Sequence, residues 1–152
     1  MQLLVELGYC SQATHSQAPP NQKILNTGVL LDTTGDGVGN KSVNVYAIGN
    51  AGQMYWFAAL VNGELIGVTQ NMSANAYLKK NIVFNQGVLN DEGELSVTLE
   101  EAKSKFRKWN SIGKGESNAY EGIFDGRGHE VQGLFLSEYE SRRGLFRCIK
   151  GG

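Results

Sequence analysis

A glycine–aliphatic–phenylalanine triplet recurs three times in the last third of the chain, at residues 122–124, 133–135 and 144–146. Each triplet follows the previous one after 11 residues, and two such intervals make about 22 residues, close to one turn of a parallel β-solenoid. In a solenoid, short strands stack in successive turns, and each turn covers the apolar face of the turn below it. The spacing therefore predicts a parallel β-solenoid. The alternative is an antiparallel meander in which a hairpin opens after Phe124.

The composition favours a folded chain with many turns and disfavours two classes of partner. Glycine supplies 20 of the 152 residues and proline only 2, a balance typical of tight turns rather than of disorder. Fourteen basic and 15 acidic residues give a formal net charge of -1, so no basic excess is present to neutralise nucleic acid or an anionic membrane surface. The apolar runs are too short to span a bilayer. We therefore expect neither nucleic-acid binding nor membrane insertion.

The chain divides into a polar leader or linker at 1–24, predicted to be poorly ordered, and one folded region at 25–152. The first ten residues lack the positive start and the long apolar run of a secretory signal. Cys10 and Cys148 lie far apart and form no metal-binding spacing with His15 or His129. The pattern favours two unpaired thiols and leaves a disulfide between them as the alternative.

Local signals place two helices and three short strands. Asn50 and Gln53 resemble a capping box ahead of an apolar segment, and Gly63 is typical of a left-handed stop, so we expect a helix at 51–62. Thr98 and Glu101 form a second capping box, which predicts a short helix at about 99–108. Alternating apolar residues predict strands at 43–48 and 81–85, with a further short strand at 95–97.

Five stretches of the sequence between residues 49 and 146 share their order with a known kind of repeat module, and the similarity as a whole covers roughly residues 32–149. They read GNAGQMYWFAALVNG, NIVFN, WNSIG, YEGIFDGRGHEVQGLF and a final GLF. In this order they resemble the GLUG-type modules of large bacterial surface proteins. The FDG-x-GH element followed by GL and GLF is the most specific part of the resemblance. Tyr120 stands where the family pattern has phenylalanine, which is a mild departure.

The resemblance implies the N-terminal part of a right-handed parallel β-helix, with the helix at 51–62 capping or flanking it. It further implies a secreted or cell-surface bacterial protein of the adhesin or stalk kind, of which this chain is a fragment. The expected partners are host or microbial glycans or surface proteins. We also expect self-association, because a β-helix that stops after its first rungs leaves an exposed edge.

One loop carries oxygen side chains at the spacing of a calcium-binding loop. Asp32, Thr34, Asp36 and Asn40 occupy the first, third, fifth and ninth positions, and glycine occupies the sixth. Val43 stands at the twelfth position, where an EF-hand has a bidentate glutamate. The loop therefore predicts a calcium site made of these four residues, with a plain Asp/Gly turn as the favoured alternative.

Other polar and aromatic residues are interpreted as structural. Asp125, Arg127 and His129 share one glycine-rich segment, which favours a turn over a metal or acid–base site. Glu121 and Glu130 are a carboxylate pair that no pattern places around a cleft. Aromatic side chains that could stack on sugars fall on core periodicities, and we expect them to be packing residues: Tyr46, Tyr55, Trp56, Trp109 and Tyr120.

No motif of a known catalytic class is present, and no residue is predicted to be catalytic. The sequence therefore predicts a non-enzymatic structural or adhesive module. The alternative is the N-terminal part of a β-helical carbohydrate-active enzyme or peptidase whose catalytic region lies outside these 152 residues.

Overall fold

The computed structural model of the chain describes residues 25–31, 33–34, 36, 38–136 and 142–151. The predictions for the leader at 1–24, for Cys10 and for His15 lie outside the described residues. Within them the chain forms two α-helices, one short 3-10 helix at Glu116–Asn118, and short strands in two small sheets. Among the described residues, no helix is both long and apolar enough to cross a membrane.

The larger sheet has four strands in the order β1, β2, β3, β5. β1 (Leu25–Leu31) pairs antiparallel with β2 (Lys41–Ile48). β2 then pairs in parallel with β3 (Ala76–Leu78), which pairs in parallel with β5 (Phe124–Asp125). The sheet is therefore mixed, and the strand predicted at 43–48 is confirmed within β2.

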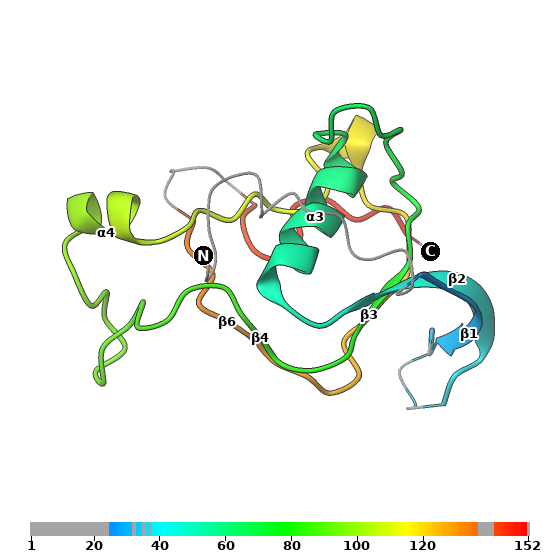
Figure 1. The fold of residues 1–152 in the computed structure, drawn as a ribbon, viewed down its shortest axis with the longest axis horizontal. Helices are drawn as coiled ribbons and strands as arrows, with labels where there is room; N and C mark the ends of the chain where they lie inside the picture. Colours follow the sequence, from blue (N-terminus) through cyan, green and yellow to red (C-terminus); the bar gives the residue numbers. More distant parts are fainter. Residues whose placement is uncertain (1–24, 32, 35, 37, 137–141, 152) are drawn as a thin grey trace.

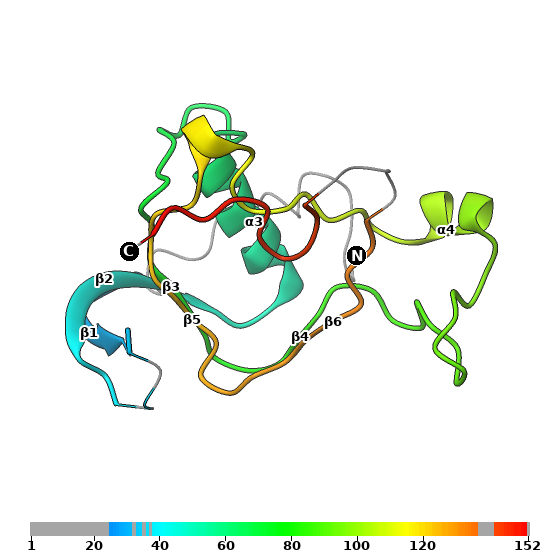
Figure 2. The same ribbon diagram turned by 180° about the vertical axis from the view of Figure 1, so that it is seen from behind.

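The smaller sheet contains two parallel strands, β4 (Ile82–Val83) and β6 (Val131–Gln132). β4 follows β3 along the chain, and β6 follows β5. The two segments that pair in the larger sheet therefore pair again here, and residues 75–85 and 123–133 run side by side (Figures 1 and 2). Two isolated parallel bridges, Ile112 to Phe146 and Tyr120 to Ile149, extend this arrangement. The described residues of the C-terminal segment, 121–136 and 142–150, thus form one outer layer along residues 75–120, which we call the inner layer.

The predicted right-handed parallel β-helix is wrong, because the described residues form a small mixed α/β fold. The three triplets do not stack on one another as successive turns would. Phe124 pairs with Ala76, and Phe146 pairs with Ile112. Their backbone partners therefore come from 48 and 34 positions earlier in the chain, not from the neighbouring triplet. The hairpin alternative fails too, because β5 and β6 pair with different strands and not with each other.

Helix α3 (Ala51–Asn62) is the centre of the core and confirms the helix predicted there. The Asn50 side chain accepts a hydrogen bond from the Gln53 backbone N–H at 2.8 Å, and Gly63 ends the helix at a φ of 73°. Rather than capping one end of a solenoid, α3 lies between the β3–β4 segment and residues 108–120 (Figures 1 and 2). It buries Met54, Trp56, Phe57, Ala58, Ala59, Leu60, Val61 and Asn62.

Helix α4 (Leu99–Lys105) confirms the second capped helix but is shorter than predicted. Thr98 accepts a hydrogen bond from the Glu101 backbone N–H at 3.3 Å. Phe106 then adopts an extended backbone, and its ring lies 5.7 Å from that of Phe135. This contact pulls the chain out of the helix and forms a second, small apolar cluster apart from the main core.

Candidate functional site

The predicted calcium loop is closed by its own side chains. Asn40 Oδ1 accepts hydrogen bonds from the Thr33 hydroxyl at 2.7 Å and the Thr33 N–H at 3.3 Å. Asn40 Nδ2 donates to the Thr34 hydroxyl at 3.0 Å, and Asp36 Oδ1 accepts from the Val38 N–H at 2.8 Å. Asp32 lies outside the described residues. Thr34, Asp36 and Asn40, three of the predicted ligands, are thus hydrogen-bonded within the loop itself.

Calcium binding by Asp32, Thr34, Asp36 and Asn40 stays a prediction. No group of three or more His, Cys, Asp or Glu side chains able to hold a metal is found in the described part of the chain. A calorimetric titration with millimolar calcium is expected to release heat and to raise the melting temperature if an ion displaces the hydrogen bonds of the loop. Neither heat nor a shift in melting temperature would remove the prediction.

The segment around Asp125 has the geometry of a turn. Asp125 Oδ1 accepts a hydrogen bond from the Arg127 N–H at 2.9 Å, and the Arg127 guanidinium lies 3.5 Å from the same carboxylate. That guanidinium also stacks 3.8 Å over the Tyr77 ring. His129 Nδ1 lies 3.3 Å from Asn81 Oδ1. These contacts fix β5 and its turn against the neighbouring layer, as the structural interpretation expected.

Most of the aromatic residues that could form a sugar-stacking face are buried. Trp56, Trp109 and Tyr120 are buried, while Tyr46 and Tyr55 are half-buried and pack against the main core. The Tyr120 hydroxyl donates to the Ala74 carbonyl at 2.8 Å, and burial raises the pKa of this phenol above its ordinary value. The expectation that these are packing residues is therefore confirmed for the three buried ones.

Glu121 and Glu130, the carboxylate pair of the sequence, bind different partners. Glu121 forms an ion pair with Lys150 at 3.1 Å, and Glu130 accepts a hydrogen bond from Gln132 at 2.8 Å. The two carboxylates therefore have separate partners. Cys148 carries a free, half-buried thiol.

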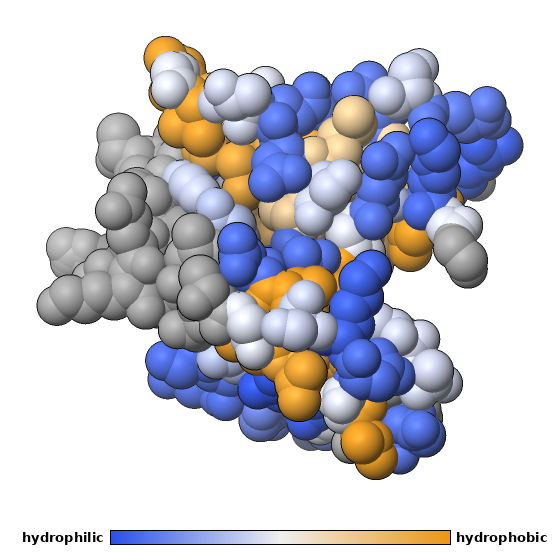
Figure 3. Space-filling view, turned by 90° about the vertical axis from the view of Figure 1, so that its right-hand side faces the viewer, coloured by the Kyte–Doolittle hydropathy of each residue, from blue (hydrophilic) through white to orange (hydrophobic). Residues whose placement is uncertain are grey.

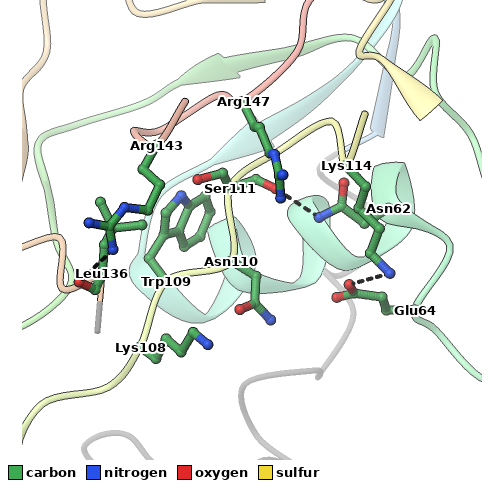
Figure 4. Close-up of a pocket in the computed structure, with 10 residues that line it drawn as sticks. All are labelled: Asn62, Glu64, Lys108, Trp109, Asn110, Ser111, Lys114, Leu136, Arg143 and Arg147. Carbon is green, nitrogen blue, oxygen red and sulfur yellow. Dashed lines mark hydrogen bonds and ion pairs between the residues drawn. The ribbon is translucent and has the colours of Figure 1, made fainter. Parts of the chain in front are cut away.

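A cleft of about 200 Å³ lies beside the end of α3. We call it the basic cleft, because its lining carries four cationic side chains and one carboxylate, Glu64. The cations are Lys108, Lys114, Arg143 and Arg147, and the other lining residues are Asn62, Trp109, Asn110, Ser111 and Leu136 (Figure 4).

Three chain segments hold the basic cleft in one shape. Asn62, the last residue of α3, is buried, and its amide donates to the Ser111 carbonyl at 3.0 Å while accepting from the Gly113 N–H at 2.9 Å. The Ser111 hydroxyl donates to the Gly144 carbonyl at 2.7 Å. The Ile112 N–H donates to the Leu145 carbonyl at 3.0 Å. The helix end, residues 108–114 and residues 143–147 are therefore tied together below the charged side chains.

The four cations of the cleft are exposed, so their charges meet solvent rather than the core. Lys114 forms an ion pair with Glu64 at 3.0 Å, and Arg143 donates to the Leu136 carbonyl at 3.3 Å (Figure 4). A chain of formal charge -1 thus concentrates positive charge at one rigid recess. Such a recess attracts carboxylate, sulfate or phosphate groups.

Sequence reasoning did not find the basic cleft. Its cations come from two segments that lie more than 25 residues apart, and each segment supplies only two of them. Only the parallel contact between residues 108–114 and 143–147 brings them together. The lone signal in the sequence is the block at 142–150, which has four cations and no carboxylate.

Comparison with known proteins adds no relative: no family model, no curated protein and no solved structure matches the chain.

Proposed function

We propose that this chain is a non-enzymatic binding module that holds an acidic glycan through its basic cleft. The observation that carries the proposal is the grouping of four exposed cations around a rigid recess in a chain of slightly negative net charge. The recess of about 200 Å³ is smaller than most ligand pockets, which measure about 300–1,000 Å³. It suits one charged sugar unit of a longer polymer better than a whole ligand.

The adhesive role, the glycan or surface-protein partner and the bacterial cell-surface location expected from the sequence belong to this proposal. The resemblance of the motifs to surface-protein modules supports them, although the β-helical fold that it implied does not hold. A shallow site built on exposed lysine and arginine suits repeated weak contacts along a polymer, because multivalent binding gains strength from many sites.

The test compares one lysine inside the basic cleft with one outside it, and both are ion-paired and similarly exposed. Lys114 lies in the cleft and pairs with Glu64 at 3.0 Å, whereas Lys103 lies on α4 and pairs with Glu100 at 3.1 Å. Their side chains are similarly exposed, at 53% and 46%. We expect Lys114→Gln to weaken binding of alginate, a polymer of uronic acids, about tenfold, the loss of one charge-assisted contact. We expect Lys103→Gln to leave it unchanged.

Binding is measured by calorimetry with alginate, with neutral dextran and with a DNA duplex. The proposal predicts that alginate binds, that its affinity falls with added salt, and that dextran does not bind. Equal binding of dextran would contradict it, because the site would then not select charge. Tighter binding of the duplex, or equal losses in the two lysine variants, would contradict it too.

A further inference from the structure

Glu64 is the one carboxylate among the described residues that line the basic cleft, where every other charged side chain is a cation. Its Oε2 lies 3.0 Å from Lys114 Nζ (Figure 4). The Lys114 ammonium is also one of the groups that hold an anionic ligand in the proposed function. A carboxylate at this place opposes the binding of anions, and its effect depends on how much negative charge a ligand brings.

The backbone is anchored on both sides of this ion pair. The Glu64 N–H donates to the Ala59 carbonyl of α3 at 2.8 Å. Lys114 directly follows Gly113, whose N–H donates to Oδ1 of the buried Asn62 at 2.9 Å. The end of α3 therefore holds both charged residues, and a ligand can separate Glu64 from Lys114 only by rotating their side chains.

A bound anion and Glu64 share the same cation. A ligand carboxylate that reaches Lys114 comes within a few ångströms of the Glu64 carboxylate, because both contact one ammonium group. Two like charges about 4 Å apart in water repel enough to weaken binding about fivefold. Each further anionic group nearby adds to this cost, whereas a ligand hydroxyl donates a hydrogen bond to the same carboxylate. Glu64 thus disfavours dense negative charge and favours a hydroxyl beside a single acid group.

We propose that Glu64 is the specificity-determining residue of the basic cleft, and that it selects a hydroxyl-rich uronic acid unit over a densely sulfated or phosphorylated polymer. The cations hold the single carboxylate of the sugar, and Glu64 accepts a hydrogen bond from a hydroxyl of the same unit. A second anionic group on the unit meets Glu64 instead, and this repulsion is the source of the selectivity. The inference rests on the proposed function, because it assigns a ligand class to the same cleft.

Glu121 offers a matched control, because it forms a similar ion pair outside the cleft. It lies 3.1 Å from Lys150, and its side chain is 34% exposed, against 30% for Glu64. Hydrophilic residues are spread among apolar ones over the side of the molecule shown in Figure 3, so an effect of total charge has to be separated from an effect of the cleft. Glu64→Gln and Glu121→Gln each remove one negative charge and keep the size of the side chain.

The experiment measures the binding of alginate and of dextran sulfate by calorimetry, with the unchanged full chain and the two variants. Alginate has one carboxylate on each sugar unit, and dextran sulfate is densely sulfated. We expect Glu64→Gln to bind dextran sulfate about five- to tenfold more tightly and alginate within about twofold of the unchanged chain. We expect Glu121→Gln to change neither. Both variants are expected to stay folded, because exposed ion pairs contribute little to stability, and circular dichroism checks this.

The outcomes separate this inference from the proposed function. No alginate binding to the unchanged chain would overturn the proposed function, and the ligand class assigned here would fall with it. Where alginate binds the unchanged chain, an equal gain for both polymers in Glu64→Gln would overturn this inference alone, because Glu64 would then not select between them. No gain for dextran sulfate would overturn it too, as would the same gain in Glu121→Gln.

Discussion

Replacing Trp109 with alanine is expected to lower the free energy of unfolding by about 3–5 kcal/mol. The side chain is 1% exposed, and its ring lies 4.8 Å from Phe84 and 5.4 Å from Tyr55. Its indole N–H donates to the Leu145 carbonyl at 3.2 Å, so it joins α3, the inner layer and the outer layer. The loss is a large share of the roughly 5–15 kcal/mol that stabilises a domain.

Chemical denaturation monitored by circular dichroism measures this loss. Trp109→Phe is the control, because it keeps most of the ring and removes the indole N–H. Its expected cost is about 1–3 kcal/mol, from lost packing and the lost indole hydrogen bond, while the Leu145 carbonyl keeps its hydrogen bond from the Ile112 N–H. Equal stability of Trp109→Ala and the unchanged chain would mean that the indole is not a core residue.

Replacing Gly122 with alanine is expected to cost about 1–3 kcal/mol or more, because the two layers touch there through their backbones. A Cβ built on Gly122 collides with the Ala74 carbonyl. The Glu121 N–H donates to the Met72 carbonyl at 2.8 Å, which holds the two segments at this short separation. Backbone atoms of both layers would have to move apart to admit a methyl group.

Gly126→Ala is the matched control for this prediction. Neither glycine has a positive φ, and a Cβ at Gly126 meets nothing within 4 Å. The same chemical change is therefore expected to be nearly neutral at Gly126. Thermal denaturation of the two variants gives the comparison. Equal melting temperatures for the two would contradict the close contact of the layers at Gly122.

The helices could be predicted because their signals are local. Asn50 and Thr98 cap helices by bonding to the N–H three residues later, and Gly63 stops α3 in a left-handed conformation. Such contacts lie within a few residues, so the sequence order itself contains them. The end of α4 could not be predicted, because Phe106 leaves the helix to meet Phe135, which is distant in sequence.

The strand partners could not be predicted, because the repeat suggested that its own segments pair with one another. The 11-residue spacing of Phe124, Phe135 and Phe146 suggested that these segments stack on one another. Their backbone contacts instead run to Ala76, Trp109 and Ile112. A sequence period shows which residues are apolar, but it does not show which segments they pair with. These backbone pairings join residues 26 to 48 positions apart, and they depend on which apolar surface α3 and the earlier segment leave exposed.

The candidate site shows the same division between local and distant information. The turns at Asp36 and Asp125 rest on hydrogen bonds that span two residues, so the sequence order itself contains them, and calcium binding at the first of these turns stays a prediction. The basic cleft needs residues 108–114 and 143–147 to lie together, and no local pattern expresses that contact.

The central claim is that the C-terminal segment lies as one parallel layer along residues 75–120. Nuclear Overhauser contacts between backbone protons of the labelled protein test it most directly. The account predicts cross-strand contacts between Ala76 and Phe124 and between Ile82 and Val131, in parallel register. Backbone contacts between the Phe124 and Phe135 segments, in place of these, would contradict it.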